Sequence, residues 1–129
     1  MSNLCLYILV RNDMASMTPG RQAAQATHAA NQFVKEYQTA EFVSVEQWQS
    51  EANGFGTVIV LHGKWDDIKA HVNDAASEGF ATGFVVDPTY PIKDGDVYHT
   101  VSVITCAYVF GDKAALRAKT GIAWFDLMP

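Results

Sequence analysis

The chain has 129 residues, a length for which one domain spanning residues 1–129 is expected. Its net charge of −5 and its nine Lys and Arg residues count against a general nucleic-acid binder, whose affinity comes largely from contacts between cationic side chains and phosphates. The same composition leaves room for an enzyme that uses a small basic patch.

The N-terminal segment has no charged start followed by a long apolar core, as a signal peptide would have. The apolar run 4–10 is far too short to span a membrane. The two cysteines, Cys5 and Cys106, each lie in an apolar run, so we expect buried thiols in a reducing compartment. These features predict a cytoplasmic location and no membrane partner.

Apolar runs and turn residues alternate along the chain in a way that predicts strands separated by helices. The predicted strands cover residues 4–11, 57–62, 81–86 and 100–110. The predicted helices cover residues 19–37, 45–49, 64–79 and 112–120. A turn is predicted at 53–56, a Pro- and Asp-rich loop at 89–99, and a short strand or coil at 122–127. The predicted strand 57–62 contains a continuous apolar run, residues 58–61, as is typical of a buried strand.

This order of elements predicts the α/β class: a single three-layer domain with a four-stranded mixed β-sheet flanked by helices. Helical crossovers make the first three strands mutually parallel, with right-handed connections. The fourth strand follows a loop without a helix, so we expect it to run antiparallel to the third.

The helix predicted at 19–37 carries the most informative pattern. Thr18 can cap its N-terminus, and Pro19 suits the first helical position because its missing N–H would be unpaired there anyway. One face of the helix is polar and consists of Arg21, Gln25, His28 and Gln32. Another face is more apolar and consists of Ala23, Thr27, Ala30, Val34 and Tyr37. A basic, polar stripe at a helix N-terminus suits an anion such as phosphate.

The segment Val10-Arg11-Asn12-Asp13-Met14 and the segment from Met17 to Ala29 together resemble the signature of the peptidyl-tRNA hydrolase 2 family, the archaeal and eukaryotic type. In that family a strand ending in Val-Arg-x-Asp-Leu precedes a helix start of the form Met-x-x-Gly-Lys-x-Ala-Ala-Gln-x-x-His-Ala. The resemblance implies a four-stranded mixed sheet and hydrolysis of the ester that joins a peptide to tRNA. It also implies that no metal or cofactor is needed, and that the enzyme grips peptidyl-tRNA by its 3′ arm and phosphates.

Ligand sites of open α/β sheets lie off the carboxyl ends of the parallel strands. We therefore expect a set of polar side chains to converge at one edge of the sheet, namely Asp13, Arg21, His28, Asp87 and Thr100. By the resemblance, Asp87 orients the water, Arg21 supplies electrostatic stabilisation and Thr100 donates a hydrogen bond. Asp13, Gln25 and His28 form the surround.

Two positions depart from the family pattern. Arg21 stands where the family usually has Lys; it keeps the charge but cannot act as a base, because a guanidinium does not deprotonate. Pro91 stands where the family has a Thr, in a loop about one residue longer, and Thr89 is a candidate substitute.

Structural roles are the alternative for each of these residues. Arg21 can be a solvated first-turn residue, and Asp87 before Pro88 is a common turn arrangement. His28 is open to a structural or a catalytic role. The remaining histidines, His62, His71 and His99, lack the spacing of metal ligands, so no metal site is predicted.

Two rival functions stay open. The chain can be a catalytically weakened or inactive relative that binds a tRNA end, an anion or a protein, or it can be a hydrolase of another acyl or amide substrate. Because members of the family are often dimers, a homodimer is one expected assembly. Phe55, Trp65 and Trp124 can serve such an interface or the core, and we expect at least two of them in the core.

Overall fold

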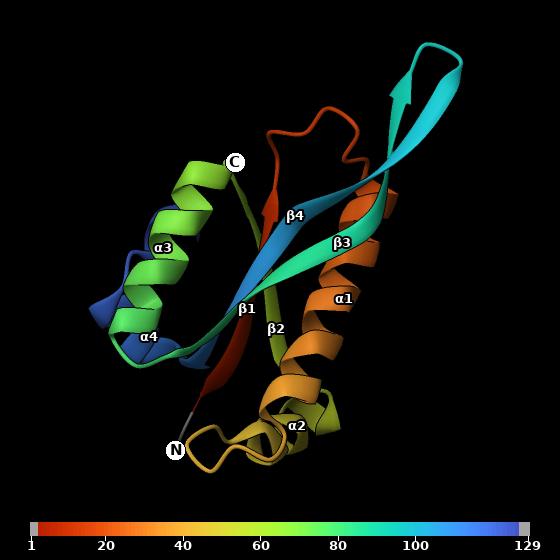
Figure 1. The fold of residues 1–129 in the computed structure, drawn as a ribbon. Coiled ribbons are helices and arrows are strands. Elements are labelled where there is room, and N and C mark those ends of the chain that lie inside the picture. Colours follow the sequence, from red (N-terminus) through yellow and green to blue (C-terminus); the bar gives the residue numbers. More distant parts are fainter. Residues whose placement is uncertain (1–2, 127–129) are drawn as a thin grey trace.

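The computed structural model describes residues 3–126, which form a four-stranded mixed sheet with helices on both faces (Figure 1). The strands are β1 (Leu4–Arg11), β2 (Thr57–Gly63), β3 (Ala81–Asp94) and β4 (Val97–Asp112), in the order β2-β1-β4-β3. The helices are α1 (Pro19–Tyr37), α2 (Val45–Ser50), the 3-10 turn η1 (Ala52–Gly54), α3 (Trp65–Ser77), α4 (Lys113–Lys119) and α5 (Ile122–Asp126). The predicted fold class is confirmed.

The strand directions follow the prediction from the connections. β1 pairs with β2 in parallel and with β4 antiparallel, and β3 pairs antiparallel with β4. The first three strands therefore run the same way and the fourth runs against them. Their carboxyl ends lie at one edge of the sheet, beside the loop that enters α1 and beside the β3–β4 hairpin (Figure 1).

The side chains of the central strands β1 and β4 fill two cores, because successive residues of a strand point to opposite faces. On one face, Ile8 and Tyr108 pack with Phe33 of α1 and Trp48 of α2. On the other face, Tyr7 and Leu9 of β1 pack with Ile68 of α3, Leu116 of α4 and Phe125 of α5. Both faces of the two central strands are thus covered, as is typical of three-layer α/β proteins.

β2 is an edge strand and is only half covered, which corrects the prediction of a buried strand. Val58 and Val60 are 42% and 41% exposed on the α1 side of the sheet. Ile59 and Leu61, which point to the other face, pack into the core beneath α3 and α5. Val58 and Val60 are exposed because α1 lies over β1, β3 and β4 rather than over β2. The apolar run in the sequence gave no sign of this difference between the two faces.

The expectation that at least two of Phe55, Trp65 and Trp124 belong to the core was wrong. Phe55 is 83% exposed and Trp124 is 47% exposed. Only Trp65 is partly buried, where its ring meets Phe84 edge-on with centroids 5.6 Å apart.

The prediction of a loop at 89–99 was also wrong, since β3 and β4 continue through these residues as a hairpin that extends beyond the helices (Figure 1). Pro88 and Pro91 suggested a break, but β3 is an edge strand, where a missing backbone N–H is tolerated. The turn between the strands contains Gly95 at φ +63°, a conformation that glycine adopts without steric cost.

The strand or coil predicted at 122–127 is a helix, α5, over Ile122–Asp126; Leu127 lies outside the described residues. The hydroxyl of Thr120 accepts a hydrogen bond from the backbone N–H of Ile122 at 3.3 Å, which supports the helix start. Ile122 and Phe125 are one turn apart and both buried. Within residues 3–126, no helix has the length and apolar character needed to cross a membrane.

Candidate functional site

The start of α1 forms as its sequence predicts. The hydroxyl of Thr18 accepts a hydrogen bond from the backbone N–H of Arg21 at 3.3 Å, and Pro19 is the first helical residue. The buried face differs from the predicted apolar face, because Ala23 and Thr27 are exposed. Its fully buried members are Gln25, Ala29 and Phe33. A polar residue therefore takes a place in the core, and its partners explain why.

Gln25 joins two side chains from strands β3 and β4. Its side-chain N–H donates to Oδ2 of Asp87 at 2.8 Å, and its Oε1 accepts from the hydroxyl of Thr105 at 2.6 Å. Gln25 is 4% exposed and Thr105 is fully buried. Because the hydroxyl of Thr105 has a single proton and donates it to Oε1, the amide nitrogen of Gln25 faces Asp87.

Two irregularities of the β3–β4 pairing turn these side chains toward α1. Val85 pairs with Cys106 and Val86 with Ile104, so that Thr105 has no partner residue on β3. Further along, Asp87 pairs with Val103 and Tyr90 with Val101, which leaves Pro88 and Thr89 opposite a single residue of β4. Such bulges re-aim side chains, and they are common next to active sites.

The carboxylate of Asp87 is held in its ionised form. Partial burial opposes ionisation, but hydrogen bonds from the backbone N–H of Thr89, the amide of Gln25 and the hydroxyl of Thr89, together with the nearby His28, outweigh it. The pKa of Asp87 therefore lies below its ordinary value of 3.8. The two bonds from Thr89 reach Oδ1, at 2.9 Å from its N–H and 3.4 Å from its hydroxyl.

A cavity of about 330 Å³ lies beside this carboxylate. Its walls are formed by His28, Gln32, Val85, Val86, Asp87, Pro88 and Thr89. His28 is exposed at the position three residues after Gln25 on α1, and Gln32 is anchored by a 2.8 Å bond from its side-chain N–H to the carbonyl of Phe84. The structure thus brings together four of the predicted site residues: Gln25, His28, Asp87 and Thr89.

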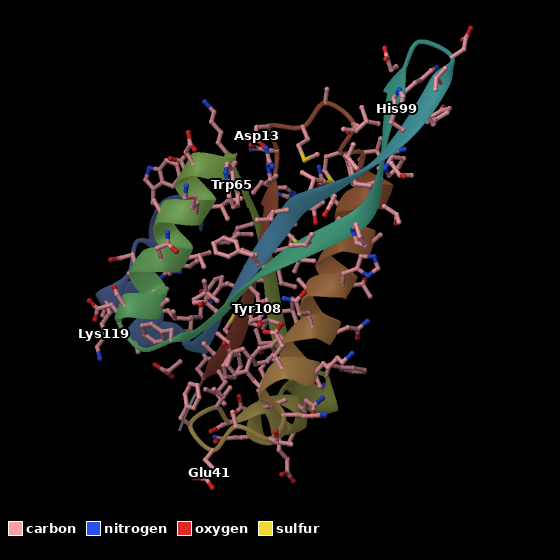
Figure 2. The ribbon with its side chains drawn as sticks, viewed as in Figure 1. Asp13, Glu41, Trp65, His99, Tyr108 and Lys119 are labelled. Carbon is pink, nitrogen blue, oxygen red and sulfur yellow. The ribbon has the colours of Figure 1, made fainter. Side chains whose placement is uncertain are left out.

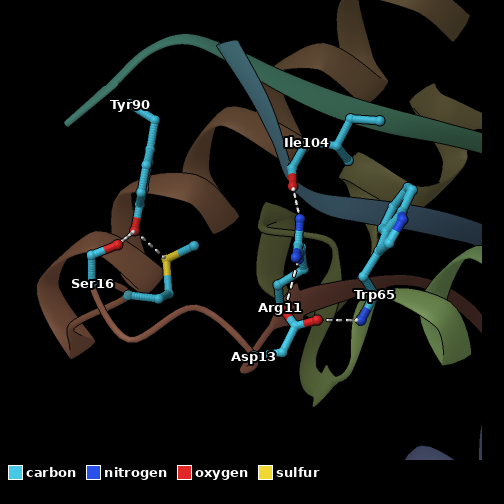
Figure 3. A network of polar contacts seen from close by, with 7 residues as sticks. Arg11, Asp13, Ser16, Trp65, Tyr90 and Ile104 are labelled. Atoms are coloured by element: carbon cyan, nitrogen blue, oxygen red, sulfur yellow. Dashed lines mark hydrogen bonds and ion pairs between the residues drawn. The ribbon is translucent and has the colours of Figure 1, made fainter. Parts of the chain in front are cut away.

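Arg21 has a different set of contacts. Its guanidinium donates to the carbonyl of Ser16 at 2.7 Å and lies 5.9 Å from the ring centre of Tyr90. The hydroxyl of Tyr90 is 3.0 Å from Oγ of Ser16, a contact drawn in Figure 3. Within residues 3–126, no ion pair joins Arg21 to Asp87. Arg21 therefore helps to fasten the loop before α1 to the hairpin.

Asp13 braces the same end of the sheet (Figure 3). Its carboxylate accepts from Nε of Arg11 at 2.8 Å and from the backbone N–H of Trp65, the first residue of α3, at 2.9 Å. Arg11 also donates to the carbonyl of Ile104 at 3.2 Å, and its guanidinium lies 5.5 Å from the ring of Trp65. Burial opposes ionisation of Asp13, but the bonds from Arg11 and Trp65 prevail and keep its pKa below 3.8.

Thr100 lies outside the group around Asp87. It is exposed on β4 opposite Pro91, in the part of the hairpin beyond the second irregularity (the neighbouring His99 is labelled in Figure 2). The hydroxyl that reaches Gln25 belongs to Thr105, which sequence reasoning missed. Both residues lie in one β-branched run, and the only signal that separates them is a bulge that the sequence does not reveal.

A metal-ligand cluster and a reactive thiol are two further kinds of site to consider among residues 3–126. That part of the chain has no group of three His, Cys, Asp or Glu side chains arranged to hold a metal ion. Cys106 lies beside Gln25, but it is buried, and burial raises the pKa of its thiol to about 12. A thiol with this pKa stays protonated at neutral pH and is a poor nucleophile.

Comparison with known protein families identifies a match to one family model. The family model described as peptidyl-tRNA hydrolase PTH2 matches residues 4–109, a range that contains β1 to β3, most of β4 and the whole group around Asp87. No curated protein sequence matches the chain significantly.

Proposed function

Since the chain belongs to the peptidyl-tRNA hydrolase PTH2 family, we propose that it hydrolyses the ester bond between a peptide and the 3′ end of tRNA in the cavity beside Asp87. The observation that carries this proposal is the ionised carboxylate of Asp87, which Gln25 and Thr89 hold at the cavity wall. A fixed carboxylate beside a space for substrate meets the geometric requirement for orienting an attacking water.

In the proposed reaction, a water held by Asp87 attacks the ester carbonyl carbon. The bond to the 3′ oxygen of the terminal ribose then breaks, and a proton from the water passes to that oxygen. Because the lowered pKa makes Asp87 a weak base, its contribution is to orient and polarise the water while proton transfer proceeds with bond formation. Gln25 acts as a positioning residue, since it links Asp87 to the buried Thr105.

Substrate contacts are assigned by position. His28 is exposed at the cavity and can donate to the ester oxygen or to a phosphate of the 3′ arm. Arg21 uses one N–H for Ser16 and has further donors for negative charge, because a guanidinium carries five N–H groups. Thr89 lies beside Asp87, whereas a role for Thr100 requires substrate to extend along the hairpin.

One observation favours the rival function of a binding module. Arg21 fastens Ser16 and faces Tyr90, so the cation at the position of the family lysine is partly used to hold the loop. If the reaction needs a mobile or deprotonated amine here, the chain binds the tRNA end without cleaving it. The variant Arg21→Lys distinguishes the two, because a gain in hydrolysis would identify a weakened enzyme.

The direct test uses purified protein and N-acetyl-aminoacyl-tRNA, with release of the N-acetyl-amino acid as the readout. We expect hydrolysis well above the buffer rate, and faster than that of small acyl esters which lack the tRNA. Preference for the small esters would instead support a hydrolase of other acyl substrates. An absence of hydrolysis in both the natural protein and Arg21→Lys, with retained tRNA binding, would refute the enzymatic proposal and leave the binding module.

A further inference from the structure

A second cavity lies on the other side of the sheet, between α3 and α5. It has a volume of about 340 Å³, within the range typical of small-ligand sites. Its lining consists of Asp67, Ala70, His71, Asp74, Gly121, Trp124 and Phe125. The core beneath it is the one that α3, α4 and α5 share, so the cavity is separated from Asp87 by the sheet.

The polar side of this cavity carries negative charge. Asp67, His71 and Asp74 follow one another at i, i+4 and i+7, which places them on one face of α3. Among residues 3–126, no Lys or Arg lines the cavity and neither Asp67 nor Asp74 takes part in an ion pair. Two carboxylates thus face a shared space without a cation.

His71 adds no positive charge to balance them. Its side chain is 7% exposed, and within residues 3–126 its Nε2 has no hydrogen-bond partner. Burial lowers its pKa below 6.5 and outweighs the opposite effect of Asp74, so the imidazole is neutral at pH 7. A buried, unpaired ring nitrogen is an uncommon cost for a folded protein.

The other side of the cavity is aromatic. Trp124 is nearly half exposed and meets Phe125 edge-on with ring centres 5.0 Å apart, and Phe125 meets His71 with ring centres 5.2 Å apart. The faces of aromatic rings attract cations, most strongly in the case of tryptophan. An exposed tryptophan opposite two unpaired carboxylates therefore suits a ligand that is both cationic and apolar.

We propose that this cavity binds an alkylammonium group, a protonated amine carried on a short apolar chain. The ammonium lies between the carboxylates of Asp67 and Asp74, and the chain covers Ala70 and the ring of Trp124. This site is independent of the proposed hydrolysis. Gly121, Trp124 and Phe125 follow residue 109, where the family match ends, so three of the seven lining residues belong to a segment that the match does not cover.

The binding test is a titration of the ¹⁵N-labelled protein with n-butylammonium chloride, followed by nuclear magnetic resonance. The readouts are the indole N–H of Trp124, assigned with a Trp124→Phe variant, and the amide of Gly121. We expect saturable shifts at these positions and at least about fivefold weaker binding of n-butanol, which has the same chain without the charge. Equal binding of the two probes, or no saturable shift, would overturn the proposal.

Variants of the two cavity carboxylates test whether their negative charge is needed for ammonium binding. Asp67→Asn and Asp74→Asn should each weaken n-butylammonium binding about two- to fivefold, as expected for a partly exposed charge pair. Asp66→Asn is the matched control, because Asp66 is exposed on the same helix and does not line the cavity. An equal loss in the control, in variants whose spectra show a native fold, would contradict the proposal.

The amine can come from a free metabolite or from a lysine side chain of another protein. Titrations with 1,4-diaminobutane and with Nα-acetyl-lysine N-methylamide separate these sources, since the tighter of the two probes identifies the better-fitting chain. Failure of both to compete with n-butylammonium would overturn the assignment of the cavity to this class of ligand.

Discussion

At the scale of residues, the side-chain amide of Gln25 joins α1 to two strands of the sheet. Its two partners are Asp87 and Thr105, which are 62 and 80 residues away in the sequence. The buried amide has one oxygen and one nitrogen to satisfy, and each finds a partner on a different strand. The position of the Asp87 carboxylate therefore depends on a side chain that contacts neither the cavity nor, in the proposed reaction, the substrate.

Removal of the Thr105 hydroxyl tests this dependence. Thr105→Val leaves Oε1 of Gln25 buried without its donor, which should cost about 1–3 kcal/mol in the free energy of unfolding. We also expect slower hydrolysis, because the amide that holds Asp87 loses its anchor. Thr105→Ser should restore most of both losses, as measured by urea denaturation and by release of N-acetyl-amino acid.

The comparison residue is Thr100, which is exposed on the hairpin. Thr100→Val should change the free energy of unfolding by less than about 0.5 kcal/mol, as is usual for surface positions. It should also slow hydrolysis less than Thr105→Val does. The opposite order of the two rates would show that substrate reaches along the hairpin and that Thr100 is the important hydroxyl.

His71 gives a pH dependence of stability. Its pKa in the native state lies below the ordinary value of 6.5. As the pH falls, the unfolded chain therefore takes up a proton at this site before the native state does. The contribution to the free energy of unfolding is therefore full above pH 6.5 and is lost as the pH falls below it. Urea midpoints at pH 7.5 and pH 5.0 should differ more for the natural protein than for His71→Phe, and equal differences would contradict this explanation.

At the scale of elements, a close approach between neighbouring strands, on the face that α1 covers, limits which residues fit. Gly83 of β3 lies under Tyr108 of β4, and a Cβ atom at this position would collide with the ring and hydroxyl of that tyrosine. Tyr108 cannot move aside easily, because it is fully buried and its hydroxyl donates to Glu36 at 2.5 Å. The glycine thus allows an aromatic side chain to lie across the sheet.

Gly83→Ala should lower the free energy of unfolding by about 1–3 kcal/mol, the usual cost of overpacking a core. Gly20→Ala is the matched control, because a Cβ atom there has no neighbour within 4 Å and alanine favours a helix over glycine. The control should be neutral or stabilising by up to about 1 kcal/mol. A Gly83→Ala protein as stable as the natural one would show that Tyr108 can repack.

At the scale of the whole molecule, the sequence predicted the layers, the strand directions and the class of the fold. The alternation of apolar runs with turn residues and the Thr18–Pro19 start of α1 supported that prediction. The pairing irregularities could not be predicted, because the hairpin through Pro91 depends on β3 being an edge strand and no sequence signal marks the bulge at Thr105. The same limit applies to the site: Asp87 and Gln25 could be named, while the hydrogen bond between them and the anchoring of Gln25 by Thr105 needed the structure.

The proposed hydrolysis depends most on the carboxylate of Asp87, and replacement of this residue is the most direct test. Asp87→Asn keeps the shape of the side chain but removes the charge that orients water. We predict that kcat for N-acetyl-aminoacyl-tRNA falls by about 10²–10⁴-fold, with an unchanged fold, while the exposed control Asp66→Asn stays close to the natural rate. Hydrolysis by Asp87→Asn at the rate of the control would contradict the assignment of the active site to this cavity.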